Sequence, residues 1–177
     1  MEKGILISGT GGQGIVAAGE FLSEALFRAG YEVVNTRSYG SEARGGSCRS
    51  EVIVSDSELY DLQLEEADIL IVLSLPAYRR YIGRARRGGL VLIDAAVAAK
   101  LGEGDLRGDV EMVQVPAAEI AAGLENLIVA NMVLLGALAK RSELLELDLL
   151  KDAVKERMRP SMQAINLKAL EAGYDSA

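Results

Sequence analysis

The stretch that decides the fold reads ILISGTGGQG and runs from Ile5 to Gly14. Its first four residues form an apolar run ending in a small residue, which is typical of a buried parallel strand. Residues 15–29 follow with apolar side chains at helical spacing, and Gly30 stands where glycine ends many helices. The segment 33–34, Val-Val, indicates a second strand. We therefore expect a β-α-β unit with a glycine-rich turn between its first strand and its helix, the crossover that a parallel pair needs.

The rest of the chain continues this alternation. We expect further strands at 48–55, 69–73, 90–93 and 111–115, and helices at 76–84, 117–122, 126–141, 149–158 and 161–172, the last closed by Gly173. Strands that alternate with helices predict an α/β fold of three layers, a mostly parallel sheet with helices on both faces, as in Rossmann-like proteins. The length of 177 residues fits a single domain, 1–177.

Composition limits the chemistry that we expect of this chain. Its net charge of −7 disfavours nucleic acid as a partner, and it has no apolar run of the ~18 residues that a transmembrane helix needs. It contains no histidine, the commonest general base and metal ligand. The single cysteine, Cys48, allows neither an internal disulfide nor a four-thiolate iron–sulfur cluster, and we interpret it as a small buried residue. Because the N-terminus lacks signal-peptide features, we expect a cytoplasmic protein without membrane partners.

The glycine turn at 9–14, GTGGQG, matches the dinucleotide-binding fingerprint in the required strand–turn–helix context. Glycines let a ligand approach the backbone, and the free N–H groups of a helix N-terminus favour an anion. NAD-binding proteins also carry an acidic residue about 20 residues further on, after the second strand. That place holds the segment 35–37, Asn-Thr-Arg, so NAD is disfavoured, while Arg37 leaves NADP open. The alternative is that the glycines allow close packing of the helix or of a partner subunit.

A second informative loop runs from Ser38 to Gly46 and reads SYGSEARGG. Because it follows the second strand, we expect it at the same carboxyl edge of the sheet as the glycine turn, where ligands bind in open α/β sheets. Arg44 can bind a coenzyme A phosphate or a partner carboxylate, or pair with Glu42 inside the loop. Tyr39 can stack on a ring or pack at the base of the loop.

Asn131 is a polar residue within the apolar helical segment 126–141. A buried amide needs hydrogen-bond partners. We therefore expect Asn131 to bond a backbone group, such as one in a glycine loop, rather than a ligand.

Together, the two loops at this spacing resemble the gamma subunit of the 2-oxoacid:ferredoxin (acceptor) oxidoreductases. The resemblance covers essentially the whole chain and extends, in order, through the segments 67–70, 115–117, 131–137 and 172–174. Ser41 departs from the pattern, because proline is frequent at this position in the relatives.

The resemblance implies a multisubunit enzyme that decarboxylates a 2-oxoacid on thiamine diphosphate, passes electrons through iron–sulfur clusters to ferredoxin and transfers the acyl group to coenzyme A. It implies alpha, beta and ferredoxin-like delta subunits as partners. It further implies that this chain is inactive alone, holds none of these cofactors by itself and borders the coenzyme A approach. The implied substrate is 2-oxoglutarate, with pyruvate or a branched-chain 2-oxoacid as alternatives.

The residues that we expect in cofactor-binding or partner-facing loops share the carboxyl edge of the sheet or contact it. They are Gly9, Thr10, Gly11, Gly12, Gln13, Gly14, Ser38, Tyr39, Gly40, Glu42, Arg44, Gly45, Gly46 and Asn131. No residue is assigned a catalytic role or a metal. Two other functions stay open, a small NADP-dependent reductase and a non-catalytic module that binds coenzyme A or another phosphate ligand.

Arginines at positions 79, 80, 84, 86 and 87 form a basic cluster in an otherwise acidic protein. Cations near the end of a helix suit its dipole, so the cluster is interpreted first as a solvated face. The alternative is a docking patch for an acidic partner surface or for coenzyme A phosphates.

Overall fold

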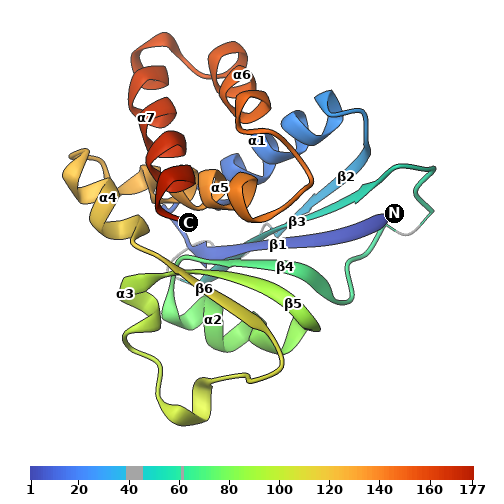
Figure 1. The fold of residues 1–177 in the computed structure, drawn as a ribbon, viewed down its shortest axis with the longest axis vertical. Coiled ribbons are helices and arrows are strands. Elements are labelled where there is room, and N and C mark those ends of the chain that lie inside the picture. Colours follow the sequence, from blue (N-terminus) through green and yellow to red (C-terminus); the bar gives the residue numbers. More distant parts are fainter. Residues whose placement is uncertain (39–45, 61) are drawn as a thin grey trace.

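The computed structural model describes residues 1–38, 46–60 and 62–177. Within these residues, six strands form one sheet in the order β2-β3-β1-β4-β5-β6 (Figure 1). The strands are β1 (Glu2–Thr10), β2 (Glu32–Arg37), β3 (Ser47–Ser55), β4 (Ala67–Val72), β5 (Ala85–Asp94) and β6 (Glu111–Val115). Strands β1, β4, β5 and β6 are parallel, whereas β3 is antiparallel to both neighbours, β1 and β2. The expected mostly parallel sheet is confirmed.

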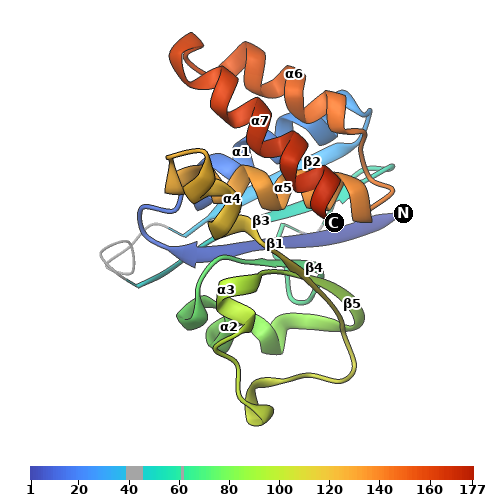
Figure 2. The same ribbon diagram turned by 60° about the vertical axis from the view of Figure 1, so that its left-hand side comes forward.

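The helices that the structure describes cover both faces of this sheet. They are α1 (Ile15–Arg28), α2 (Leu75–Tyr81), α3 (Ala95–Ala98), α4 (Ala117–Gly123), α5 (Ala130–Arg141), α6 (Leu147–Arg157) and α7 (Pro160–Ser176), with 3-10 turns η2 (Ile82–Arg84), η3 (Glu103–Asp105) and η4 (Leu127–Val129). Helices α2 and α3 lie on one face, and α1, α4, α5, α6 and α7 lie on the other (Figures 1 and 2). The expected three layers are therefore confirmed.

Alternation along β1 explains why the sheet is buried on both faces. Ile5 and Ile7 pack under α1 and α5, whereas Leu6 packs on the opposite face with Tyr78 of α2. All four side chains are almost fully buried. Successive residues of a strand point to opposite faces, so a continuous apolar run such as 5–7 requires helices on both sides.

The first crossover differs from the expectation in one respect. Strands β1 and β2 point in the same direction and are joined through α1, but they do not pair, because β3 lies between them. Strand β3 pairs with β1 from Thr10↔Ser47 to Glu2↔Ser55 and places Val52 and Val54 in the core under α1. The alternation of apolar side chains along β3 buries one face of the strand in the core, and this pattern is the same for a parallel or an antiparallel strand. The expected pairing of the first two strands is therefore wrong.

The expectation that Gly173 ends the last helix is also wrong, because α7 continues to Ser176. Gly173 instead lies where α7 crosses α5. A Cβ there would overlap the carbonyl group of Val133, and a Cβ on Gly136 would overlap the carbonyl group of Leu170. Both glycines therefore serve the close approach of two helix backbones.

Candidate functional site

The glycine turn lies where β1 ends, at Thr10, and α1 begins, at Ile15. Gly12 and Gly14 have φ angles of 91° and 69°, in the left-handed region that favours glycine. Gly9 has no space for a side chain, because a Cβ would lie 2.5 Å from Gln13 Oε1 and 2.7 Å from Ile15 Cδ1. The backbone conformation thus favours glycine at Gly12 and Gly14, whereas Gly9 leaves room for the side chains of Gln13 and Ile15.

Gln13 fills the turn with its own side chain. Its Oε1 accepts hydrogen bonds from the Thr10 N–H at 2.7 Å and from Thr10 Oγ1 at 3.1 Å. Its Nε2 donates to the Leu73 carbonyl oxygen at 3.0 Å, just beyond the end of β4. Nothing in the glycine pattern predicts this contact; the only signal for it is an amide side chain inside the turn.

The position of the Gln13 bridge matters for ligand binding. Strands β1 and β4 are neighbours, with α1 crossing over on one face and α2 on the other, so the direction of winding reverses between them (Figure 2). In doubly wound sheets this switch point is where nucleotides bind. Gln13 spans this switch point. Its side chain accepts the hydrogen bond from the Thr10 N–H, which a phosphate oxygen would otherwise accept.

The expected backbone contact of Asn131 is confirmed. Asn131 is 3% exposed, and its Nδ2 donates to the Gly14 carbonyl oxygen at 2.9 Å. Its Oδ1 accepts the Met132 N–H at 2.7 Å. This buried amide therefore fixes the start of α5 against the start of α1.

The described ends of the second loop lie at the expected edge. Thr10 pairs with Ser47, which places Gly46 beside the glycine turn, and the Ser38 N–H donates to the Arg49 carbonyl oxygen at 3.2 Å. The other candidate residues of this loop fall outside the described residues. They are Tyr39, Gly40, Glu42, Arg44 and Gly45.

Arg37, the candidate for a 2′-phosphate, lies at the end of β2 and pairs with Glu20 of α1 at 2.8 Å. Because β3 separates β2 from β1, this end is one further strand spacing, about 4.8 Å, from the glycine turn than in the Rossmann arrangement. The glycine half of the fingerprint is therefore present, but its acidic residue is absent, and Arg37 in its place lies further from the glycine turn than in the Rossmann arrangement.

The arginine cluster is largely balanced by carboxylates of the same chain. The ion pairs are Arg79–Asp105 at 3.3 Å, Arg84–Glu51 at 2.6 Å, Arg86–Asp68 at 2.6 Å and Arg87–Asp109 at 3.7 Å. The Arg80 guanidinium lies 5.6 Å from the centre of the Tyr81 ring. Hydrogen bonding to Arg79 holds the pKa of Asp105 below its ordinary value. The cluster is thus a surface network of ion pairs rather than a field of uncompensated positive charge.

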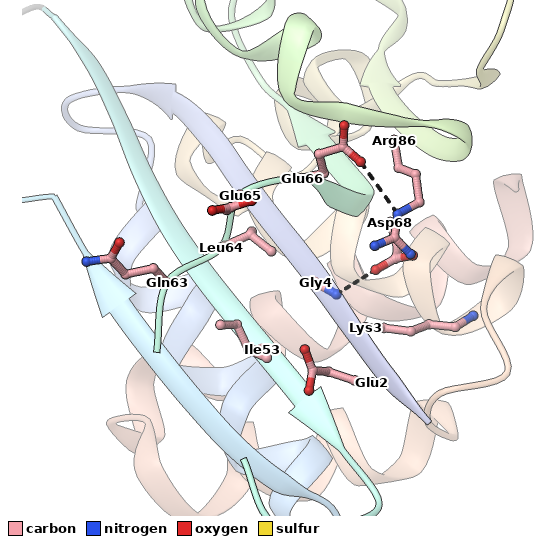
Figure 3. A pocket seen from close by; sticks show the side chains of 10 residues that line it. All are labelled: Glu2, Lys3, Gly4, Ile53, Gln63, Leu64, Glu65, Glu66, Asp68 and Arg86. Carbon is pink, nitrogen blue, oxygen red and sulfur yellow. Dashed lines mark hydrogen bonds and ion pairs between the residues drawn. The ribbon is translucent and has the colours of Figure 1, made fainter. Parts of the chain in front are cut away.

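Figure 3 shows a pocket of about 280 Å3 at the opposite edge of the sheet. Its walls are mostly charged, and Asp68 is its best-fixed side chain. The Asp68 carboxylate accepts the Gly4 N–H at 2.8 Å and pairs with Arg86 (Figure 3). The pocket lies at the amino ends of β1 and β4, away from the carboxyl edge where open α/β sheets bind ligands. We therefore do not treat it as the functional site.

A second depression, of about 400 Å3, adjoins the glycine turn and has mostly apolar walls. We call it the η4 groove. Its walls include Gly14, Phe21, Ile128, Met158, Arg159 and Met162. It lies between the start of α1, the η4 turn and the junction of α6 with α7.

Two further observations concern the described part of the chain. No three His, Cys, Asp or Glu side chains in it form a group suited to a metal ion, and none of its helices is long and apolar enough to cross a membrane. Cys48 is only half-buried, and it packs against the core under α1.

Comparison with known proteins agrees with this architecture along nearly the whole chain. The 2-oxoglutarate synthase subunit KorC of Methanocaldococcus jannaschii is 38% identical over 181 residues, which cover 100% of this chain and 95% of that protein. A keto/oxoacid ferredoxin oxidoreductase gamma subunit from Geobacter sulfurreducens has a TM-score of 0.85 and 31% identity, covering 99% of this chain and 98% of the other.

A larger relative has the same fold within a longer chain. The 2-oxoglutarate:ferredoxin oxidoreductase of Magnetococcus marinus, solved with 2-oxoglutarate, coenzyme A and succinyl-CoA bound, has a TM-score of 0.88 and 26% identity. The match covers 99% of this chain and 31% of that one. The family model described as pyruvate ferredoxin/flavodoxin oxidoreductase matches residues 4–176. The chain therefore belongs to the pyruvate ferredoxin/flavodoxin oxidoreductase family.

Proposed function

We propose that this chain is the gamma subunit of a multisubunit 2-oxoacid:ferredoxin oxidoreductase whose substrate is 2-oxoglutarate. The observation that carries the proposal is the end-to-end match with a 2-oxoglutarate synthase subunit at 38% identity, covering 95% of that protein. In the Magnetococcus marinus enzyme, the matching part is 31% of one longer chain. Since the chain matches the KorC relative over 95% of that protein, separate subunits are proposed to supply the remaining parts.

The residues of the chain support a division of labour in the complex. A cluster held by four thiolates needs four cysteines, and this sequence has one. It also lacks histidine for acid–base chemistry. Thiamine diphosphate and the iron–sulfur clusters are accordingly assigned to the alpha, beta and delta subunits, which pass electrons to ferredoxin. The isolated chain is inactive.

The carboxyl edge of the sheet is the part that faces the catalytic subunits and borders the coenzyme A approach. The Gln13 bridge supports a partner-facing turn over a nucleotide-holding one, because the Thr10 N–H already has an acceptor in the chain. In the second loop, Arg44 is proposed to bind a coenzyme A phosphate or a carboxylate of the partner.

Reconstitution tests the proposal. The chain is co-expressed with the thiamine-dependent and ferredoxin-like subunits, and reduction of ferredoxin is followed with 2-oxoglutarate, pyruvate or a branched-chain 2-oxoacid, each with coenzyme A. We expect the highest kcat/KM with 2-oxoglutarate in the full complex and no turnover by the chain alone. Turnover of a 2-oxoacid by the pure chain contradicts the subunit role. A preference of the full complex for pyruvate contradicts only the proposed substrate and leaves the subunit role intact.

The alternatives predict different binding results with the pure chain. A reductase binds NADPH at micromolar affinity, whereas the separation of Arg37 from the glycine turn predicts no such binding. A coenzyme A module binds coenzyme A without partners. Calorimetry with both ligands distinguishes these cases. If the Arg44→Ala variant binds coenzyme A with the same affinity as the wild-type chain, Arg44 is not part of the binding site.

A further inference from the structure

Large apolar side chains are unusually exposed beside the η4 groove. Leu127 and Ile128, consecutive in η4, are 72% and 55% exposed, and Met162 across the groove is 39% exposed. Single exposed apolar residues are common on protein surfaces, but a group around an apolar depression marks an interaction site. Ile128 and Met162 both line the groove.

The η4 turn holds its apolar side chains in a fixed conformation. The Asn126 side chain caps the turn by accepting the Ile128 N–H at 3.2 Å, and Val129 is anchored in the core. Glu125, which precedes the capping residue Asn126, has a φ angle of 57°. This left-handed conformation costs energy in a residue other than glycine. A capped turn that is anchored in the core by Val129 and exposes two large apolar side chains is preorganised, which reduces the entropy lost on binding.

The charges around the groove indicate the kind of partner. Among the described residues, no Asp or Glu lines the groove, although the chain carries a net charge of −7. Arg157 and Arg159 are among its lining residues. Arg157 pairs with Glu24, whereas Arg159 is exposed and has no ion-pair partner among the described residues. A carboxylate on the partner would complement Arg159.

We propose that the η4 groove docks an apolar segment flanked by a carboxylate, supplied by a thiamine-dependent subunit of the complex. This inference rests on the proposed function. The groove is continuous with the glycine turn, because Gly14 belongs to both and Asn131, which lines the groove, donates to the Gly14 carbonyl oxygen. An interface over the turn would therefore extend into the groove and bury Ile128 and Met162.

Two variants test the groove in the assembled complex. Ile128→Asp introduces a charge among apolar contacts, and Leu106→Asp is its matched control, since Leu106 is 56% exposed and lies far from the groove, after η3. We expect Ile128→Asp to raise the Kd for the partner subunits at least about 10-fold, and Leu106→Asp to leave it within about 2-fold. Arg159→Glu should raise the Kd about 3-fold or more and weaken its salt dependence.

Oxidative footprinting of the wild-type complex is independent of any effect of substitution on folding. Met162 should be protected from oxidation on assembly, whereas Met1, which is 46% exposed, should stay reactive. If the wild-type chain does not bind these subunits, the proposed function and this inference both fail. If it binds but Ile128→Asp binds equally well, or Met162 stays reactive, only the groove inference fails. Self-association of the chain that Ile128→Asp abolishes would assign the groove to a second copy instead.

Discussion

Asn131 of α5 donates a 2.9 Å hydrogen bond to the carbonyl oxygen of Gly14, a residue 117 positions earlier in the chain. The absence of a side chain on Gly14 makes this contact possible, because a Cβ there would lie 2.5 Å from Asn131 Nδ2. The same carbonyl oxygen also accepts the Ala18 N–H, the first hydrogen bond of α1. The amide therefore joins the two helices that position the glycine turn.

Asn131→Ala should lower the free energy of unfolding by about 1–2 kcal/mol, because the Gly14 carbonyl group loses a donor and the Met132 N–H loses its acceptor. Urea denaturation of the pure chain measures the change. Ser161→Ala, an exposed position in the first turn of α7, is the control and should stay within about 0.5 kcal/mol of wild type. Equal stability of the two variants would show that the amide does not hold the helices.

Gln13→Ala should speed hydrogen exchange of the Thr10 amide, because that N–H loses its acceptor at 2.7 Å. Gln13→Glu separates the two ends of the bridge. It keeps an acceptor for Thr10 but loses the donor to the Leu73 carbonyl group, so the Thr10 amide should stay protected. Exchange followed by NMR measures both variants. A Thr10 amide that exchanges at the same rate in wild type and in Gln13→Ala contradicts the bridge.

The sequence was sufficient to predict the strands, every helix except the short α3 (Ala95–Ala98), and where Asn131 finds a partner. Apolar periodicity reports burial directly, and a buried amide must be satisfied, so both inferences follow from local chemistry. The shared edge of the two loops followed from the direction of β1 and β2, and the Thr10↔Ser47 pair confirms it for the described ends of the second loop.

The neighbours within the sheet could not be predicted in the same way. The apolar residues Val52 and Val54 predict a half-buried strand at β3, but they do not predict which strand β3 pairs with. Its insertion next to β1 depends on the total packing under α1, where the Cβ that Gly19 lacks would overlap the Ser50 hydroxyl group. The Gln13 bridge was missed for a related reason. Glycine spacing describes the backbone of the turn and not the side chain that fills it.

Gly173→Ala should destabilise the chain by about 2–3 kcal/mol, because the added methyl group overlaps the Val133 carbonyl group and forces α7 away from α5. The control is Gly123→Ala at the end of α4, where an added Cβ meets nothing within 4 Å. It should be neutral or slightly stabilising, since alanine favours helix more than glycine does. Thermal and urea unfolding measure both changes. A tolerated alanine at Gly173 would contradict a helix crossing that requires glycine.

Stability should also fall in acid through the ion pairs between α1 and α6. Glu24 of α1 pairs with Arg28 at 2.8 Å and with Arg157 at 2.7 Å, and Arg28 also pairs with Glu156 at 2.5 Å. Hydrogen bonds from Arg28, and then from Arg157, lower the pKa of Glu24 below its ordinary value. The hydrogen bond from Arg28 likewise lowers the pKa of Glu156.

The sign of the pH effect follows from these lowered values. Near the ordinary pKa of a glutamate, the unfolded chain binds more protons than the folded one, so the free energy of unfolding rises with pH there. The contribution of these pairs is complete above the unfolded pKa of about 4.3 and disappears as the pH falls through the folded pKa. Glu24→Gln should therefore reduce stability at pH 7 and flatten the slope below pH ~5.

Urea unfolding from pH 7 down to pH ~3 measures this slope, with Glu103→Gln as the control, an exposed carboxylate outside the ion pairs described. Salt should shrink the difference between wild type and Glu24→Gln, because the pairs are partly exposed. An unchanged slope in Glu24→Gln, or an equal change in Glu103→Gln, would mean that other carboxylates govern the acid response. In that case, the junction of α1 with α6 is held by Phe21, Leu22 and Val154 of the apolar core rather than by its charges.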